Sequence, residues 1–125
     1  MVFEDLKGKI FTEIKGAVGD EEIIFTTNKG EKYKLFHDQD WCECVDIVDI
    51  AGDFQDLLGS PVLLAEEVIS DNETPEGVKP QDQADDSFTW TFYKLSTIKG
   101  SVTIRWYGES NGYYSESVDF EKIKA

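Results

Sequence analysis

The densest group of side chains able to do chemistry lies within eight residues of the chain: His37, Asp38, Asp40, Cys42 and Cys44. Imidazole nitrogen and thiolate sulfur are the ligands that zinc prefers, sometimes joined by a carboxylate. Two cysteines one residue apart leave the same face of a strand, so both can reach one ion. His37 would then close the site from a facing strand. The pattern is compatible with zinc binding at this point of the chain.

The same residues also fit a purely structural role. Zinc-binding sequences usually contain two pairs of cysteines with about two to four residues between the members, whereas this chain has one pair with a single residue between. A buried structural cysteine with a capping histidine is therefore the alternative interpretation. A disulfide between Cys42 and Cys44 is not expected, because side chains that leave one strand at this spacing form poor bridges.

Residues typical of enzymes are scarce. The chain has one His and one Arg, and it contains neither of the glycine-rich motifs that cradle phosphates. A nucleophilic triad would need His37 beside a serine or Cys42, oriented by Asp38 or Asp40, and no nucleophile elbow follows this stretch. We therefore expect a protein that is not an enzyme.

Arg105, the sole arginine, is followed directly by two aromatic residues. A guanidinium group beside aromatic rings can bind a carboxylate or phosphate and stack on a ring. One hypothesis is a module that binds and sequesters a small ligand, such as a signalling nucleotide, through Arg105, Tyr107 and Tyr113. The alternative is an internal salt bridge from Arg105 to Glu109 or Glu116.

The charge of the chain is concentrated in its middle. The protein has 26 acidic and 12 basic residues, and residues 35–93 hold 15 of the acids with Lys79 as the only base. A net charge of −14 argues against direct contact with nucleic-acid phosphates, which requires Lys and Arg. It favours docking on a basic groove of another protein, although a solvated face that maintains solubility is the alternative. The residues expected to bind the partner are Asp38, Asp40, Trp41, Glu43, Asp46, Asp49, Asp53 and Asp56.

The elements that position these residues are mostly strands. The length of 125 residues predicts a single domain over residues 1–125, of the α+β class and predominantly antiparallel β-sheet. Strands are expected at residues 9–15, 22–27, 31–37, 41–50, 62–69, 88–97, 101–107 and 113–120. One short helix is expected near residues 53–58, with Asp53 as its cap and Gly59 after its end. Residues 70–87 form an acidic loop that is expected to be mobile or to bind the partner.

The last three strands are expected to form a meander with one aromatic face buried. Apolar and polar side chains alternate along the first two of these strands, so every second residue shares a face. The buried face is expected to carry Phe88, Trp90, Phe92, Val102, Ile104 and Trp106.

The sequence shows no segment for a membrane or for export. No continuous apolar run approaches the roughly 18–20 residues that span a bilayer, and residues 1–20 lack the apolar core of a signal peptide. Few cysteines and no expected disulfide are typical of a reducing compartment. We expect a cytoplasmic protein.

Several blocks of the sequence resemble a family of small uncharacterised proteins of tailed phages and prophages. The blocks are residues 36–43 (FHDQDWCE), 46–50 with 52–53, 89–95 (TWTFYKL) and 105–116 (RWYGESNGYYSE), and the resemblance covers roughly residues 30–120. The family carries adjacent cysteines after the position of Asp40, whereas this chain has Trp41 and Cys42. Cys44 stands where a serine is usual, so His37, Asp40 and Cys42 are the candidate metal ligands that match the family.

This resemblance implies a biological context for the acidic surface. Small acidic phage proteins often block host defence by occupying a nucleic-acid channel, and anti-CRISPR proteins are the best-known group. The resemblance thus implies a non-enzymatic inhibitor of a host nucleic-acid-handling defence enzyme, such as a CRISPR nuclease, in the cytoplasm of the bacterial host. The nucleotide-sequestering module and a zinc-stabilised structural domain at His37 and Cys42 are the alternatives.

Overall fold

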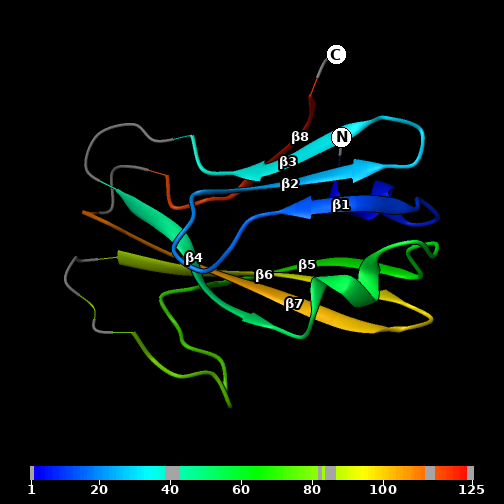
Figure 1. The fold of residues 1–125 in the computed structure, drawn as a ribbon. Coiled ribbons are helices and arrows are strands. Elements are labelled where there is room, and N and C mark those ends of the chain that lie inside the picture. The colour runs from blue at the N-terminus through cyan, green and yellow to red at the C-terminus, as the bar shows by residue number, and fades with distance from the viewer. Residues whose placement is uncertain (1, 39–42, 82, 84–86, 112–114, 124–125) are drawn as a thin grey trace.

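The protein is a sandwich of two four-stranded antiparallel sheets (Figure 1), as given by a computed structural model that describes residues 2–38, 43–81, 83, 87–111 and 115–123. The first sheet has the strand order β1 (Phe11–Lys15), β2 (Glu22–Thr27), β3 (Lys32–Phe36), β8 (Asp119–Ile123). The second sheet has the order β4 (Cys44–Ala51), β7 (Gly100–Ser110), β6 (Ser87–Thr97), β5 (Leu64–Asp71). Two single turns of 3₁₀ helix, η1 (Phe3–Leu6) and η2 (Phe54–Leu57), complete the described elements. The expected β-rich fold is confirmed.

The core lies between the two sheets and follows from the alternation along their strands. In β2, Ile23 and Phe25 are buried while Ile24 between them is only half-buried on the other face, as a period of two requires. Phe25 and Leu35 of the first sheet belong to the same apolar cluster as Ile47 and Trp106 of the second. Burial of these side chains from both sheets is the main stabilising contribution to the fold.

The hairpin of β6 and β7 has the expected strands but not the expected faces. The register pairs Trp90 with Tyr107 and Phe92 with Arg105, so these four side chains share the outer face of the second sheet. The inner face instead carries Tyr93 and Leu95 with Val102, Ile104 and Trp106. The expectation of one common aromatic face was wrong because the register that pairs the two strands was not predictable from the alternation within each strand.

The outer face is covered by part of the loop between β5 and β6. Val78 packs on a cluster formed by Trp90, Phe92 and Tyr107, and Trp90 Nε1 donates a hydrogen bond of 3.2 Å to Thr74 Oγ1. Both faces of the β6–β7 hairpin are therefore buried. Residues 72–81 of the acidic loop thus have a packing role that their polarity did not indicate.

The last expected strand and the expected helix differ in detail from the structure. The final strand is β8, which begins at Asp119 and lies beside β3 in the first sheet, with Phe120 opposite Leu35, so it does not extend the β6–β7 meander. The expected helix is a single 3₁₀ turn, where the Asp53 carboxylate accepts a hydrogen bond of 2.9 Å from the Gln55 amide. A register shift in β4 between Ile47 and Asp49 marks a bulge next to the outer face.

Candidate functional site

His37 lies between two oxygen atoms in the interior. Its Nδ1 is 2.7 Å from the carbonyl oxygen of Ser117 and its Nε2 is 3.0 Å from Glu43 Oε1, and the side chains of His37 and Glu43 are 2% and 0% exposed. A carbonyl oxygen only accepts, so Nδ1 carries a hydrogen and donates it to the Ser117 carbonyl. Both ring nitrogens are thus engaged by the protein itself.

This arrangement bears on two of the expected roles. The side chain of Glu43 is buried against His37, so it does not lie on the surface as its expected role in binding a partner requires. A metal ion at His37 would have to displace Glu43 or Ser117, and the described residues hold no group of three metal-ligating side chains. Asp40 and Cys42, the other expected metal ligands, lie outside the described residues, and Cys44 is exposed on β4.

A second buried polar group lies on the inner face near the same end of the sandwich. Glu116 accepts a hydrogen bond of 2.7 Å from Thr89 Oγ1 and another from Ser110 Oγ, and Thr89 Oγ1 is also 3.0 Å from Asp71 Oδ1. Asp71, Thr89 and Glu116 line a cavity of about 390 Å³. Because Glu116 is committed to this network, it is not the partner of Arg105.

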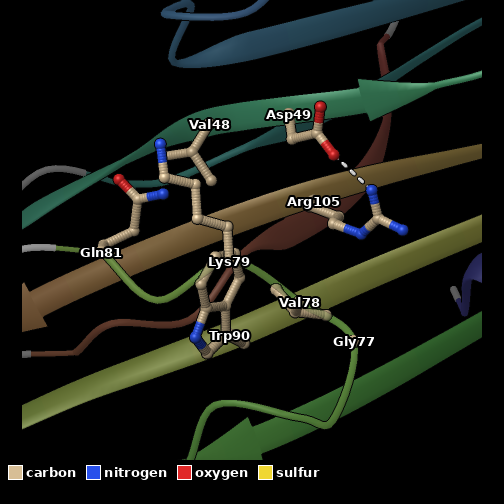
Figure 2. A pocket seen from close by; sticks show the side chains of 8 residues that line it. All are labelled: Val48, Asp49, Gly77, Val78, Lys79, Gln81, Trp90 and Arg105. Carbon is tan, nitrogen blue, oxygen red and sulfur yellow. Dashed lines mark hydrogen bonds and ion pairs between the residues drawn. The ribbon is translucent and has the colours of Figure 1, made fainter.

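Arg105 pairs with Asp49 of the neighbouring strand β4, which the register places directly opposite. The guanidinium carbon also lies 5.8 Å from the centre of the Phe92 ring. The expected internal salt bridge therefore exists with Asp49 in place of Glu109 or Glu116, because residues directly opposite each other on neighbouring strands point to the same face. Figure 2 shows Arg105 turned toward Asp49 at the edge of a cavity of about 400 Å³.

The other expected ligand-binding residues are not part of this cavity's lining. Tyr107 is buried in the aromatic cluster, with ring centres 4.9 Å from Trp90 and 5.7 Å from Phe88. Burial, followed by the charges of Glu109 and Glu116, raises the pKa of Tyr107 to about 12. Tyr113 lies outside the described residues. The cavity instead includes Lys79, which sequence reasoning noted only as an isolated base.

Acidic residues gather where the loop between β1 and β2 lies beside β4 (Figure 1). Gly19 N–H donates to the Ile47 carbonyl at 2.7 Å, and Ile47 N–H donates to the Asp20 carbonyl at 3.0 Å. This contact brings Glu21 near Asp46, and burial together with the charge of Glu21 raises the pKa of Asp46.

We call this group the acidic edge, defined as Asp20, Glu21, Glu22 and Asp46. None of its carboxylates forms an ion pair with a basic group among the described residues. Sequence reasoning missed its first three members because they lie outside the acidic middle of the chain. A run of three consecutive acids at the start of a predicted strand was the available signal.

The remaining acids expected to bind a partner do not join the acidic edge in one patch. Asp53 caps η2, which follows the end of β4, and Asp56 lies beside Gly100 at the start of β7. Asp49 is held by Arg105, and Asp38 is exposed just after β3. Asp40 and Trp41 lie outside the described residues.

Comparisons with known proteins bear on the family. No curated protein and no solved structure matches the chain. No helix among the described residues has the length and apolar character needed to cross a membrane. A family model described as a domain of unknown function (DUF7448) matches residues 4–120, which is nearly the whole chain. The chain therefore belongs to this family of uncharacterised proteins.

Proposed function

We propose that this protein acts by binding, and that its acidic edge docks on a basic groove of a partner protein. The observation that carries the proposal is the pair of backbone hydrogen bonds that joins Gly19 and Asp20 to Ile47 and so places Glu21 near Asp46, 25 residues away in sequence. Like charges held together without a cation cost stability. A partner that supplies Lys or Arg would relieve this repulsion on binding.

The partner class follows from the chemistry of such grooves. Proteins that handle nucleic acids bind phosphates through Lys and Arg, and a row of carboxylates presents the same sign of charge as phosphates. Together with the resemblance of several sequence blocks to a family of tailed-phage and prophage proteins, this chemistry leads us to propose a phage-encoded inhibitor of a host nucleic-acid-handling defence enzyme, similar in action to anti-CRISPR proteins, in the cytoplasm of the bacterial host. The net charge of −14 supports fast, steered association with a basic groove.

The test is binding to a panel of purified RNA-guided nucleases, with DNA cleavage by each nuclease as the functional measurement. The test variant neutralises the acidic edge through Asp20→Asn, Glu21→Gln, Glu22→Gln and Asp46→Asn. The control variant neutralises four exposed acids elsewhere, through Glu13→Gln, Glu73→Gln, Glu76→Gln and Glu121→Gln. Both variants lose the same formal charge at different positions, and the control variant also removes two exposed ion pairs, those of Glu13 with Lys15 and Glu121 with Lys34.

The proposal expects a nuclease that the wild type and the control variant inhibit and the test variant does not. Its binding should weaken strongly between about 50 mM and about 500 mM NaCl, because the interaction between exposed charges is screened by salt. Equal loss in both variants would show that net charge alone matters. Binding that is unchanged by salt would rule out the electrostatic mechanism.

A further inference from the structure

Strand β5 forms one edge of the second sheet, and the side of it that faces away from β6 is called here its free side. The opposite edge strand, β4, is closed by the loop between β1 and β2, because Gly19 and Asp20 share backbone hydrogen bonds with Ile47. No described segment forms backbone hydrogen bonds of this kind along the free side of β5. A long edge strand with unpaired backbone groups is a template for another extended segment.

The register shows which backbone groups lie on the free side. Residues 64–71 pair with β6 without a shift, and the next amide, Asn72 N–H, donates to the Phe88 carbonyl at 2.8 Å. Backbone bonding in an antiparallel pair alternates with a period of two, so the even-numbered residues of β5 bond to β6. The N–H and C=O groups of Glu67, Ile69 and Asp71 therefore point away from β6, where an added strand can pair with them.

The side chains of β5 indicate the chemistry of an added strand. Leu64, Val68 and Ile69 are exposed, and Ile69 reaches 55%. The sequence of the strand, LAEEVISD, contains three acids and no base. A second copy of the chain paired at this edge would double these acids without adding a base. The charge therefore favours a different protein, whose extended segment carries Lys or Arg among apolar residues.

A cavity of about 390 Å³ lies beside the same strand. Its lining includes Ile69 and Asp71 of β5 and, directly opposite them in the register, Thr91 and Thr89 of β6. Glu116 completes the acidic part of the lining, and none of the described residues at this cavity is basic. Every second side chain of a strand added to β5 would face the same way as Ile69 and Asp71. One such side chain would thus lie at this cavity.

The polar groups of the cavity are not fully partnered within the protein. The Thr91 side chain lines the cavity, yet it is 2% exposed and makes no hydrogen bond with any described residue. Thr89 Oγ1 lies 2.7 Å from Glu116 Oε1 and 3.0 Å from Asp71 Oδ1, although a hydroxyl has one hydrogen to donate. A lysine ammonium brings three N–H donors and a positive charge, which suits two carboxylates and a free hydroxyl oxygen.

We propose that the free side of β5 binds an extended segment of a partner protein and that a lysine of this segment occupies the cavity. The segment pairs with the backbone of Glu67 and Ile69, and its lysine ammonium lies among Asp71, Glu116 and Thr91. Backbone pairing supplies affinity, and the cavity supplies specificity for the basic side chain. The inference is independent of the proposed docking of the acidic edge, which lies beside β4 at the opposite edge of the sheet.

The probe is a capped heptapeptide that alternates valine and lysine, titrated calorimetrically into the full chain at about 150 mM NaCl. We expect a dissociation constant below about 1 mM. A peptide of the same composition with its lysines in one block cannot place lysine and valine on opposite faces, so it should bind at least tenfold more weakly. Equal binding of the two peptides overturns the proposal, because charge alone would then explain it. No binding of the alternating peptide at about 5 mM overturns it as well.

Amide hydrogen exchange locates the strand pairing. In the free protein the amides of Glu67 and Ile69 should exchange quickly, because no carbonyl of the described chain accepts them. The bound peptide should slow both at least tenfold relative to the amide of Val68, which already bonds to β6. Binding of the peptide without this slowing overturns the proposed pairing.

Variants test the role of the cavity. Asp71→Asn should weaken binding of the alternating peptide about tenfold and Thr91→Val about threefold, since each removes an acceptor for the ammonium. Asp56→Asn and Thr26→Val are the matched controls, which make the same changes away from the cavity lining. The Thr91 hydroxyl has no hydrogen bond to lose among the described residues, so Thr91→Val should fold as the wild type does. Unchanged affinity in both cavity variants overturns the assignment.

Two further measurements separate this inference from the proposed function and from self-association. The acidic-edge variant should bind the peptide as the wild type does, even where it no longer inhibits a nuclease, because its changes lie at the other edge of the sheet. Loss of peptide binding in this variant would contradict the placement at β5. A dimer in solution that Ile69→Lys converts to a monomer would assign the free side to a second copy and overturn the proposal.

Discussion

His37 and Glu43 join the two sheets through a contact of 3.0 Å between Nε2 and Oε1, inside the protein and at one end of the sandwich. His37 directly follows β3 of the first sheet, and Glu43 directly precedes β4 of the second. The other ring nitrogen of His37 holds the carbonyl of Ser117, in the segment that returns the chain to the first sheet. The His37 side chain therefore contacts both segments that pass between the sheets at this end of the sandwich, the one between β3 and β4 and the one between β7 and β8.

Breaking this pair should destabilise the protein strongly. His37→Leu leaves the Glu43 carboxylate buried without its imidazole partner, so we expect the free energy of unfolding to fall by about 3 kcal/mol. Glu43→Leu should have a similar effect. The double variant should lose clearly less than the sum of the two, because it leaves neither polar group without the other. Urea denaturation of the four proteins gives the coupling, and strictly additive losses would show that the pair does not act as a unit.

The fold was largely predictable because alternation within a strand records which face is buried. Strand β2 has the predicted bounds, residues 22–27, with Ile23 and Phe25 in the core. What alternation does not record is which strands are neighbours. The prediction of a meander at the end of the chain was wrong because the Glu116 side chain and the Ser117 carbonyl bond to interior groups, and the strand pairing begins only at β8.

The candidate sites were less predictable because they form between distant segments. Asp46 was identified as an acid in the middle of the chain, but its neighbour Glu21 belongs to a terminal region with balanced charge. Arg105 was identified as a ligand-binding residue, whereas Lys79 reaches the same cavity only because Val78 anchors the loop on Trp90. Proximity of this kind depends on tertiary packing, which a single sequence does not display.

Alkaline pH should destabilise the protein through two tyrosines. Burial and the hydrogen bond to Glu67 raise the pKa of Tyr93, and burial raises that of Tyr107 to about 12. Above pH about 10 the unfolded chain ionises at these positions while the folded chain stays protonated. The free energy of unfolding should therefore hold up to pH about 10 and then fall. Tyr107→Phe should flatten the fall between pH 10 and 12, and a curve identical to the wild type would contradict this assignment.

Acidic pH should act through Glu31. Its carboxylate lies 3.1 Å from Lys122 Nζ and 3.3 Å from Lys9 Nζ, and these contacts, that of Lys122 first, lower the pKa of Glu31 to about 2. Because the pKa of Glu31 is lower in the folded state, the ionised carboxylate stabilises the folded protein at pH values above the ordinary pKa of glutamate. This contribution is lost as the pH falls toward about 2. Glu31→Gln should flatten the stability curve between pH 4.5 and 2, and Lys122→Met should give an intermediate slope. Equal slopes in all three proteins would disprove the coupling.

The acidic edge should make the isolated protein less stable than its neutralised variants. The raised pKa of Asp46 means that the folded state resists ionisation of this carboxyl, so stability is lost as the pH rises through the ordinary range for aspartate. Asp46→Asn and Glu21→Gln should each raise the free energy of unfolding by about 0.5 kcal/mol at low salt, as expected for relief of one like-charge contact near the surface. Because both changes remove the same repulsion, the double variant should gain less stability than the sum of the two single variants.

Denaturation at about 10 mM and about 500 mM NaCl checks the cause, since the gain in stability should shrink at high salt. A gain that persists at high salt would mean that burial of Asp46, and not its approach to Glu21, is responsible, and the repulsion available to a basic partner would then be small.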